Sequence, residues 1–259
     1  MTQWMVLYRK ELKEMVRNYK FLWIPIVFIL LGVMQPVSAY YLPEILDKFG
    51  NLPEGTILEM PTPTGAAVLI DVLSNYGTLG VLILVLGAMG IVSAERQSGV
   101  ASIVMVKPVP YSSYILSKWA GLLTITFISL FIGYLASWYY TSLLIETVAF
   151  DRILQSVLIY SIWLVFVVTL TLCFSTIMKG TGSVAFITIF VVFAISTVTS
   201  ILSKYMKWSP ATMTEYAAQG LLSAELDSSF LLSFISTIVI IIVILILSIQ
   251  IFKRKELLE

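Results

Sequence analysis

The sequence contains no histidine and only one cysteine, Cys173. The absence of histidine excludes zinc proteases of the HExxH kind, serine–histidine intramembrane proteases and histidine-based proton relays. A single cysteine within an apolar run can form neither a disulfide inside the chain nor a cysteine-based metal site. We therefore expect no metal and no cofactor bound by this chain itself.

Charged residues are also scarce. They make up 12% of the 259 residues, whereas 59% are hydrophobic, and the mean hydropathy is +0.96. Soluble domains have about 25% charged and about 45–50% apolar residues, so this chain has too little polar surface for a soluble fold. The net charge of +1 gives no reason to expect a nucleic-acid partner. The composition predicts a protein embedded in the lipid bilayer.

Six long uncharged stretches have the length of a membrane-spanning helix. About 20 apolar residues span a bilayer as a helix, and only helices or closed barrels satisfy their backbone hydrogen bonds there. A barrel is excluded because runs such as FISTIVIIIVILILSI do not alternate in polarity. The sequence predicts an all-α integral membrane protein forming one transmembrane domain over residues 1–259. The expected spans are residues 21–42, 72–94, 119–143, 153–177, 182–203 and 229–252.

No charged residue lies near the middle of any of these spans. A charge there costs about 2.5–3.5 kcal/mol and persists mainly for function. Carriers coupled to ions or protons usually place acids near the midplane, whereas Asp71, Asp151 and Asp227 fall at expected outer boundaries. There is no GxxxxGK[ST] phosphate loop. We therefore expect a bundle with no titratable interior, no ATPase of its own and no enzymatic activity.

Serine and threonine residues within the spans have two interpretations. They are typical of hydrogen bonding between membrane helices, or they form a mildly polar lining for a substrate path. The sequence does not separate the two. The residues concerned include Thr124, Thr126, Ser129, Thr188, Ser196, Thr197 and Thr199.

The first 20 residues form an amphipathic pattern. Apolar and aromatic residues recur at three- and four-residue spacing among several lysines and arginines. A basic amphipathic helix with aromatic anchors tends to lie in the membrane interface. The segment does not fit a signal peptide, since its charged region is too long and no small-residue cleavage site follows.

The distribution of lysine and arginine predicts the orientation. If the N-terminus is cytoplasmic, only Lys48, Arg152, Lys204 and Lys207 of the 16 basic residues fall outside. Basic residues are enriched in cytoplasmic loops. We therefore expect a multi-pass protein of the cell membrane with both termini in the cytoplasm.

Two outer loops are expected to differ in character. The first, residues 43–71, is rich in proline and reads as an irregular surface segment. The last, residues 204–227, contains Ser209 followed by Pro210, which is a helix-start signal. It predicts one or two short helices at the outer face before the sixth span.

The cytoplasmic segment 95–118 is the most distinctive part of the chain. Val100, Ile103 and Val104 fall at helical spacing, and Pro108 ends that pattern. Ser112 and Ser113 are candidate N-caps for the third span. The segment is either an ordinary loop whose charges anchor the flanking helices, or a segment that a partner protein binds and moves.

The stretch ERQSGVASIVMVKPVPYSSYILSK resembles the loop after the second span in permease subunits of ABC-2 type ATP-binding cassette transporters. The matching residues are Glu95, Arg96, Gly99, Pro108, Ile115, Leu116 and Lys118. The opening stretch KELKEMVRNYKFL is similar to the interfacial elbow helix of that family. The six-span plan with cytoplasmic termini fits as well.

The resemblance implies that this segment forms a coupling helix that docks on a separate ATPase subunit, which would bind ATP and Mg. Two permeases, identical or paralogous, would work with two ATPases. The implied coupling residues are Glu95, Arg96, Gly99, Val100, Ile103, Val104, Lys107 and Pro108. The implied secondary inner contact is Met178, Lys179 and Gly180, and the implied elbow residues are Trp4, Lys10, Glu11, Glu14 and Arg17.

The resemblance further implies export, and the lack of a large outer domain favours a small molecule, drug or peptide as cargo. An immunity or sensor protein that binds a cationic peptide at its outer face is the alternative, because acids populate the outer loops. A secondary carrier driven by an ion gradient is a third hypothesis, and the absence of acids in the middle of the spans argues against it. The outer acids are Glu44, Asp47, Glu54, Glu59, Asp71, Glu215, Glu225 and Asp227.

Overall fold

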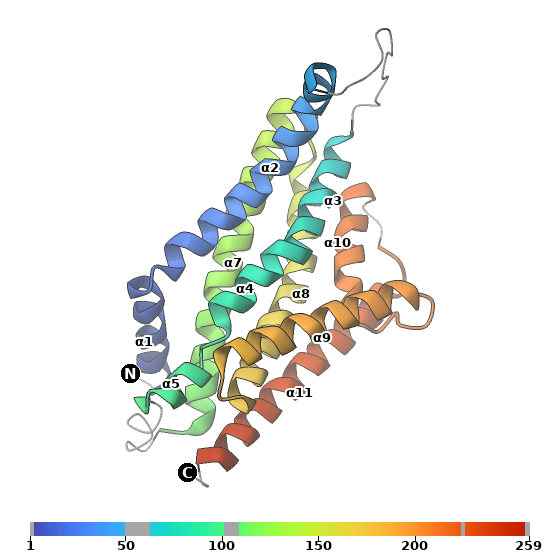
Figure 1. Ribbon diagram of the computed structural model, residues 1–259. Coiled ribbons are helices and arrows are strands. Elements are labelled where there is room, and N and C mark those ends of the chain that lie inside the picture. The colour runs from blue at the N-terminus through green and yellow to red at the C-terminus, as the bar shows by residue number, and fades with distance from the viewer. Residues whose placement is uncertain (1–2, 50–62, 101–108, 224–225, 257–259) are drawn as a thin grey trace.

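The computed structural model describes residues 3–49, 63–100, 109–223 and 226–256, and every regular element in these ranges is a helix. Six helical stretches in the described residues, one of them made of several segments, are long and apolar enough to cross a membrane. They form one elongated bundle (Figure 1). The prediction of an all-α protein with six spans is confirmed.

Two helices open the chain. Helix α1 (Gln3–Arg17) is short, and α2 (Lys20–Phe49) follows after a sharp turn at Tyr19, whose φ is +55°. Both pack against α7 (Tyr111–Leu144). Helix α2 therefore extends beyond the expected span of residues 21–42.

The second span is divided into segments. It runs from Gly65 to Gln97 and consists of α3 (Gly65–Asn75), the π-helical turn η1 (Tyr76–Gly80), α4 (Val81–Ala88) and α5 (Ser93–Gln97). It begins earlier than the expected residues 72–94, so that Asp71 lies within α3 with an exposed side chain. The Thr64 hydroxyl caps α3 by accepting a hydrogen bond from Ala67 N, at 3.3 Å.

The remaining helices surround α8 (Phe150–Ile177). In the most apolar part of α8, 78% of the residues are buried, compared with 50% or less in the other five spans. The helices that surround α8 are α9 (Thr181–Ile201), the short α10 (Thr212–Leu222) and α11 (Phe230–Glu256). Helix α8 is thus the centre of the core.

Both chain ends lie at the same end of the bundle (Figure 1). We call it the terminal end, and the other the opposite end. Helix α10, which precedes the sixth span as predicted, packs along α8 and α3 toward the opposite end. It begins at Thr212 with Ala211 as its N-cap, three residues after the serine of the predicted start signal.

The start of α7 corrects one sequence-based prediction. The helix begins at Tyr111 with Pro110 as its N-cap, so Ser112 and Ser113 lie in its first turn and are not N-caps. Proline suits a helix start because its fixed φ is compatible with the helix and its missing N–H is not needed there. Lys118 therefore lies two turns inside α7, and not in a loop before it.

Glycines allow α2 and α7 to approach closely near Tyr76. A Cβ added to Gly133 would lie 2.7 Å from the Tyr76 hydroxyl and 2.8 Å from the carbonyl oxygen of Phe28. That same hydroxyl donates a hydrogen bond of 2.8 Å to the Phe28 carbonyl. The contact thus involves backbone atoms that cannot move aside cheaply.

We expect Gly133→Ala to lower the stability of the folded bundle by about 1–3 kcal/mol, because it overpacks this contact. The measurement is the thermal unfolding temperature of the purified protein in detergent. Gly182→Ala is the matched control, since a Cβ there meets nothing within 4 Å. Equal unfolding temperatures for the two variants would contradict the packing argument.

Candidate functional site

A buried lysine lies at the terminal end of the bundle. The Lys118 side chain of α7 is only 1% exposed. Its ammonium lies 3.0 Å from a carboxylate oxygen of Glu11 and 2.9 Å from one of Glu95. This finding corrects the expectation of a bundle without a titratable interior.

Glu95 connects three helices. It lies in α5 and is 7% exposed. Besides Lys118, its carboxylate accepts hydrogen bonds from Lys10 of α1 and from the Tyr114 hydroxyl of α7, the latter at 2.5 Å. We call Lys10, Glu11, Glu95, Tyr114 and Lys118 the charge network. Its two carboxylates and two ammonium groups balance, which is the condition for burying ionised side chains.

Lys10 forms the outer edge of the charge network. Its ammonium also lies 3.1 Å from carboxylate oxygens of Glu11 and Glu14. Burial alone would lower the pKa of Lys10, but Glu11, Glu95 and Glu14 outweigh it and raise that pKa above its ordinary value. Lys10 therefore stays charged across the physiological pH range.

Three carboxylates lie close together around Lys10. Oxygens of Glu11, Glu14 and Glu95 lie within 4.8 Å of one another, a spacing that a metal ion could bridge. Lys10 pairs with all three, and Lys118 pairs with two of them. The two ammonium groups already supply the compensating charge, so the arrangement is an ion-pair network.

Helix α1 lies close against α7. A Cβ added to Gly121 would lie 3.3 Å from Cβ of Glu11, so a small residue is needed there. Trp4 stacks on Tyr8, and the Tyr8 hydroxyl is 2.8 Å from Oγ1 of Thr124. Tyr8 and Glu11 thus hold α1 on the third span, and Glu11 is one of the residues predicted for an elbow helix.

A break in the second span precedes α5. The backbone N–H groups of Val92 and Ser93 donate to Oγ of Ser175, at 3.1 and 3.0 Å, and that hydroxyl donates to the Met89 carbonyl at 2.9 Å. One buried serine of α8 therefore satisfies backbone groups that the break leaves unpaired. It fixes the direction in which α5 leaves the bundle.

The end of α5 contacts the turn between α8 and α9. Arg96 donates to the Thr176 carbonyl at 3.3 Å, and Gln97 donates to the Lys179 carbonyl at 2.7 Å. From α11, Lys255 donates to the Ile177 carbonyl. The predicted secondary inner contact, Met178, Lys179 and Gly180, therefore adjoins the root of segment 95–118.

The remaining predicted coupling residues follow α5. Gly99 has a φ of +74°, a left-handed conformation that favours glycine, and Val100 is 37% exposed. Ile103, Val104, Lys107 and Pro108 lie outside the described residues.

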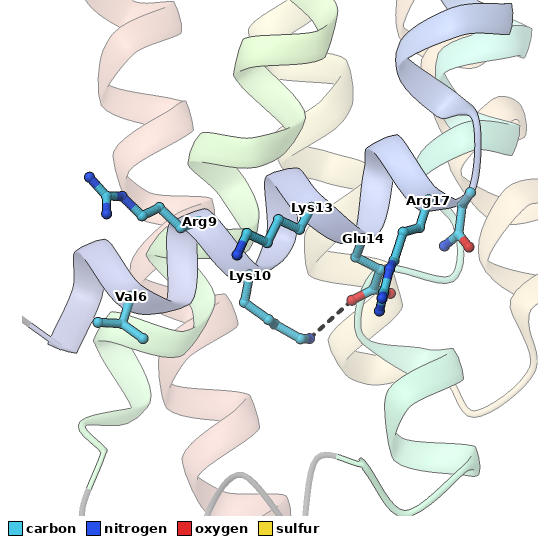
Figure 2. A pocket seen from close by; sticks show the side chains of 7 residues that line it. Val6, Arg9, Lys10, Lys13, Glu14 and Arg17 are labelled. Atoms are coloured by element: carbon cyan, nitrogen blue, oxygen red, sulfur yellow. Dashed lines mark ion pairs between the residues drawn. The ribbon is translucent and has the colours of Figure 1, made fainter.

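The outward face of α1 carries a basic row. Arg9, Lys13 and Arg17 are exposed at four-residue spacing and line an open groove with Lys10 and Glu14. Figure 2 shows these side chains on the side of α1 that faces away from the ribbons behind it, with the Lys10–Glu14 ion pair drawn as a dashed line. Arg17, predicted as an elbow residue, belongs to this face and not to the charge network.

Sequence reasoning missed Tyr114, Lys118 and Ser175 as parts of this region. Lys118 is one of the residues that resemble the family's loop, but its ion-pair partners lie 107 and 23 residues away in the sequence and no local pattern links them. Among the span hydroxyls, Ser129 and Thr188 bond to carbonyls of their own helices, and Thr199 pairs with Ser209. Structural hydrogen bonding thus accounts for Ser129, Thr188 and Thr199, whereas Oγ1 of the buried Thr126 has no hydrogen-bond partner in the described part of the chain.

We expect Lys118→Met to destabilise the protein by about 3–5 kcal/mol, because it leaves two carboxylates buried without their central cation. Lys10→Met should cost about 1 kcal/mol or less, since the Lys10 side chain is 36% exposed. Thermal unfolding in detergent of both variants makes the comparison. A loss for Lys10→Met as large as that for Lys118→Met would contradict the assignment of Lys118 as the central cation.

Comparison with known proteins shows which family this chain resembles. The family described as "ABC-2 family transporter protein" matches residues 5–257. The chain is also 35% identical over 252 residues to a Bacillus subtilis (strain 168) protein named "Uncharacterized transmembrane protein YxlG", covering 97% of this chain and 98% of the relative. In this family ATP is hydrolysed by a separate subunit, and the membrane component has no catalytic activity. Because both matches extend over nearly the whole length, the chain belongs to the ABC-2 family of transporter membrane proteins.

Proposed function

We propose that this chain is the permease subunit of an ATP-driven exporter of a small molecule, drug or peptide, coupled through segment 95–118 to its ATPase subunit. The charge network carries the proposal. It joins the root of that segment to α1 and α7 through buried ion pairs.

The proposal follows from how a push on this segment would be transmitted. Segment 95–118 begins in α5, and its last residues form the start of α7. Because Glu95 is held by Lys118 and Tyr114, the two ends of the segment are tied to each other. A displacement by a partner would therefore move the second and third spans and α1 together.

The exposed surface of the terminal end suits a cytoplasmic position. Arg9, Lys13 and Arg17 are exposed on α1, and Lys253 and Arg254 are exposed at the end of α11. Basic residues are enriched on the cytoplasmic side of membrane proteins. We propose that this end faces the cytoplasm, where the ATPase binds ATP and Mg, and that α1 serves as the interfacial elbow helix.

The working unit we propose contains two permeases and two ATPases. The contact surface for the ATPase would be formed by Gly99, Val100 and the residues after them. The turn at Met178–Gly180 would add a secondary contact, because Gln97 already binds it from α5. Glu95 and Arg96 would act beneath that surface through their contacts inside this chain.

The test is purification of the tagged chain from its native membrane in mild detergent. We expect an ATPase with a phosphate loop to copurify, and the reconstituted complex to hydrolyse ATP and move cargo. A catalytically dead ATPase should abolish the transport. If the chain still transports cargo with the dead ATPase, the proposal is contradicted. If it still protects cells against a cationic peptide with the dead ATPase, direct binding of that peptide at the outer face is favoured instead.

We expect Gly99→Val to reduce coupling between ATP hydrolysis and transport by about tenfold, while the complex still assembles. A β-branched side chain is strained at a φ of +74°, so the chain would leave α5 in a different direction. The measurement is the ratio of transported cargo to ATP hydrolysed in proteoliposomes.

Gly182→Val is the control for this coupling experiment, since the site has open space around it and is not left-handed. A coupling ratio for Gly99→Val equal to that of this control would argue against the segment as the coupling element.

A further inference from the structure

A half-open groove lies on helices that contribute no residue to the charge network. It is bordered by α3, η1, α8, α9 and α10 and has a volume of about 330 Å³. Cavities that hold small organic ligands have volumes of about 300–1,000 Å³. The groove therefore has the size of a binding site for a small molecule or for one side chain of a peptide.

The lining is mostly apolar but includes four hydroxyl groups and one carboxylate, those of Ser74, Thr78, Ser196, Thr214 and Glu215. The Thr78 hydroxyl donates to the backbone carbonyls of Ser74 and Asn75. The Thr214 hydroxyl donates to the Ala211 carbonyl. Their oxygens are left with acceptor capacity only. Glu215 adds a carboxylate, and it is the one charged side chain among the described residues that line the groove. Such a surface favours a ligand that donates hydrogen bonds and carries positive charge.

One buried donor on the wall has no partner. Trp163 of α8 lines the groove and is 1% exposed, yet its indole N–H makes no hydrogen bond within the described part of the chain. The other described indoles of the core differ, since Trp119 donates to Thr169 and Trp138 to the Val148 carbonyl. A buried donor left unsatisfied costs about 1–3 kcal/mol, and a ligand with an acceptor atom would remove that cost.

Two further features support a ligand site. Phe193, which is 45% exposed, supplies aromatic surface for an apolar body and for cation–π contact. The π-helical turn η1 contributes Gly77 and Thr78 to the wall. Single π-helical turns inside α-helices occur frequently at functional sites.

We propose that this groove binds an organic cation that has an apolar or aromatic body and one hydrogen-bond acceptor. Glu215 and the threonine oxygens would bind the cationic group, and the Trp163 indole would donate to the acceptor. The identification of this ligand as transported cargo rests on the proposed function. Binding itself does not, because it needs no ATPase.

The experiment measures binding of rhodamine 123, a fluorescent aromatic cation with an ester carbonyl, to the full chain in lipid nanodiscs without ATPase. Fluorescence anisotropy gives the affinity. Dihydrorhodamine 123, the neutral reduced form, should compete at least about tenfold more weakly, because it lacks the charge that Glu215 recognises. Equal competition by the neutral compound would overturn the proposal.

Two variants locate the site. Glu215→Gln should weaken binding about fivefold, as expected for a partly solvated ion pair. Its control is Asp227→Asn, which removes a fully exposed acid outside the groove and should leave the affinity unchanged. If Glu215→Gln and its control bind the dye equally, the groove is not the site.

Trp163→Phe keeps an aromatic ring but removes the donor, and it should weaken binding about fivefold to tenfold. Trp208→Phe is its control, because Trp208 is 49% exposed and does not line the groove. Equal affinities of these two variants would remove the assigned role of the indole. Glu215→Gln changes an exposed residue, so it provides the test even if Trp163→Phe folds poorly.

A second measurement separates this proposal from the proposed function. The ATPase that copurifies is added, and ATP hydrolysis is followed with and without the dye. Dye binding that depends on Glu215, together with ATP hydrolysis that the dye leaves unchanged, would leave the site standing and refute the transport role. Coupled ATP hydrolysis with dye affinities that none of the variants alters would refute the site alone.

Discussion

Pairing of Lys118 with two buried carboxylates is the interaction on which the terminal end of this protein depends. An ammonium group that is 1% exposed within a mostly apolar bundle is tolerated only when opposite charges and hydrogen bonds surround it. Glu11 and Glu95 supply the charges, and Lys10 balances the second of them. Because the partners come from α1, α5 and α7, the requirement to bury charge in pairs also fixes how these three helices meet.

The number and type of the spans could be predicted because length and apolarity are local properties of the sequence. The charge network could not. The sequence places Lys118 at the end of the cytoplasmic segment 95–118, and nothing in its neighbourhood indicates that Glu11 lies against it. The helix in fact starts at Tyr111, so a residue expected in a loop is enclosed by three helices. Long-range pairing of charges is set by packing, which sequence periodicity does not report.

The segmented second span shows the same limit. Its apolar composition predicts one continuous helix, whereas the structure contains a π-helical turn and a break before α5. The break persists because Ser175, a residue of another helix, binds the freed backbone groups. Glu95, Lys10 and Glu11 are nevertheless candidates from the sequence alone, because they fall in stretches that resemble the family. Their contacts inside the chain came only from the structure.

The charge network also constrains the order in which the protein can be assembled. Synthesis proceeds from the N-terminus, so Glu11 and Glu95 leave the ribosome before Lys118 does. Until the start of α7 has been made and has entered the membrane, the two carboxylates have only Lys10 as a described cationic partner in the network. The first two spans therefore cannot reach their final arrangement on their own, and completion of this end of the protein waits for the third.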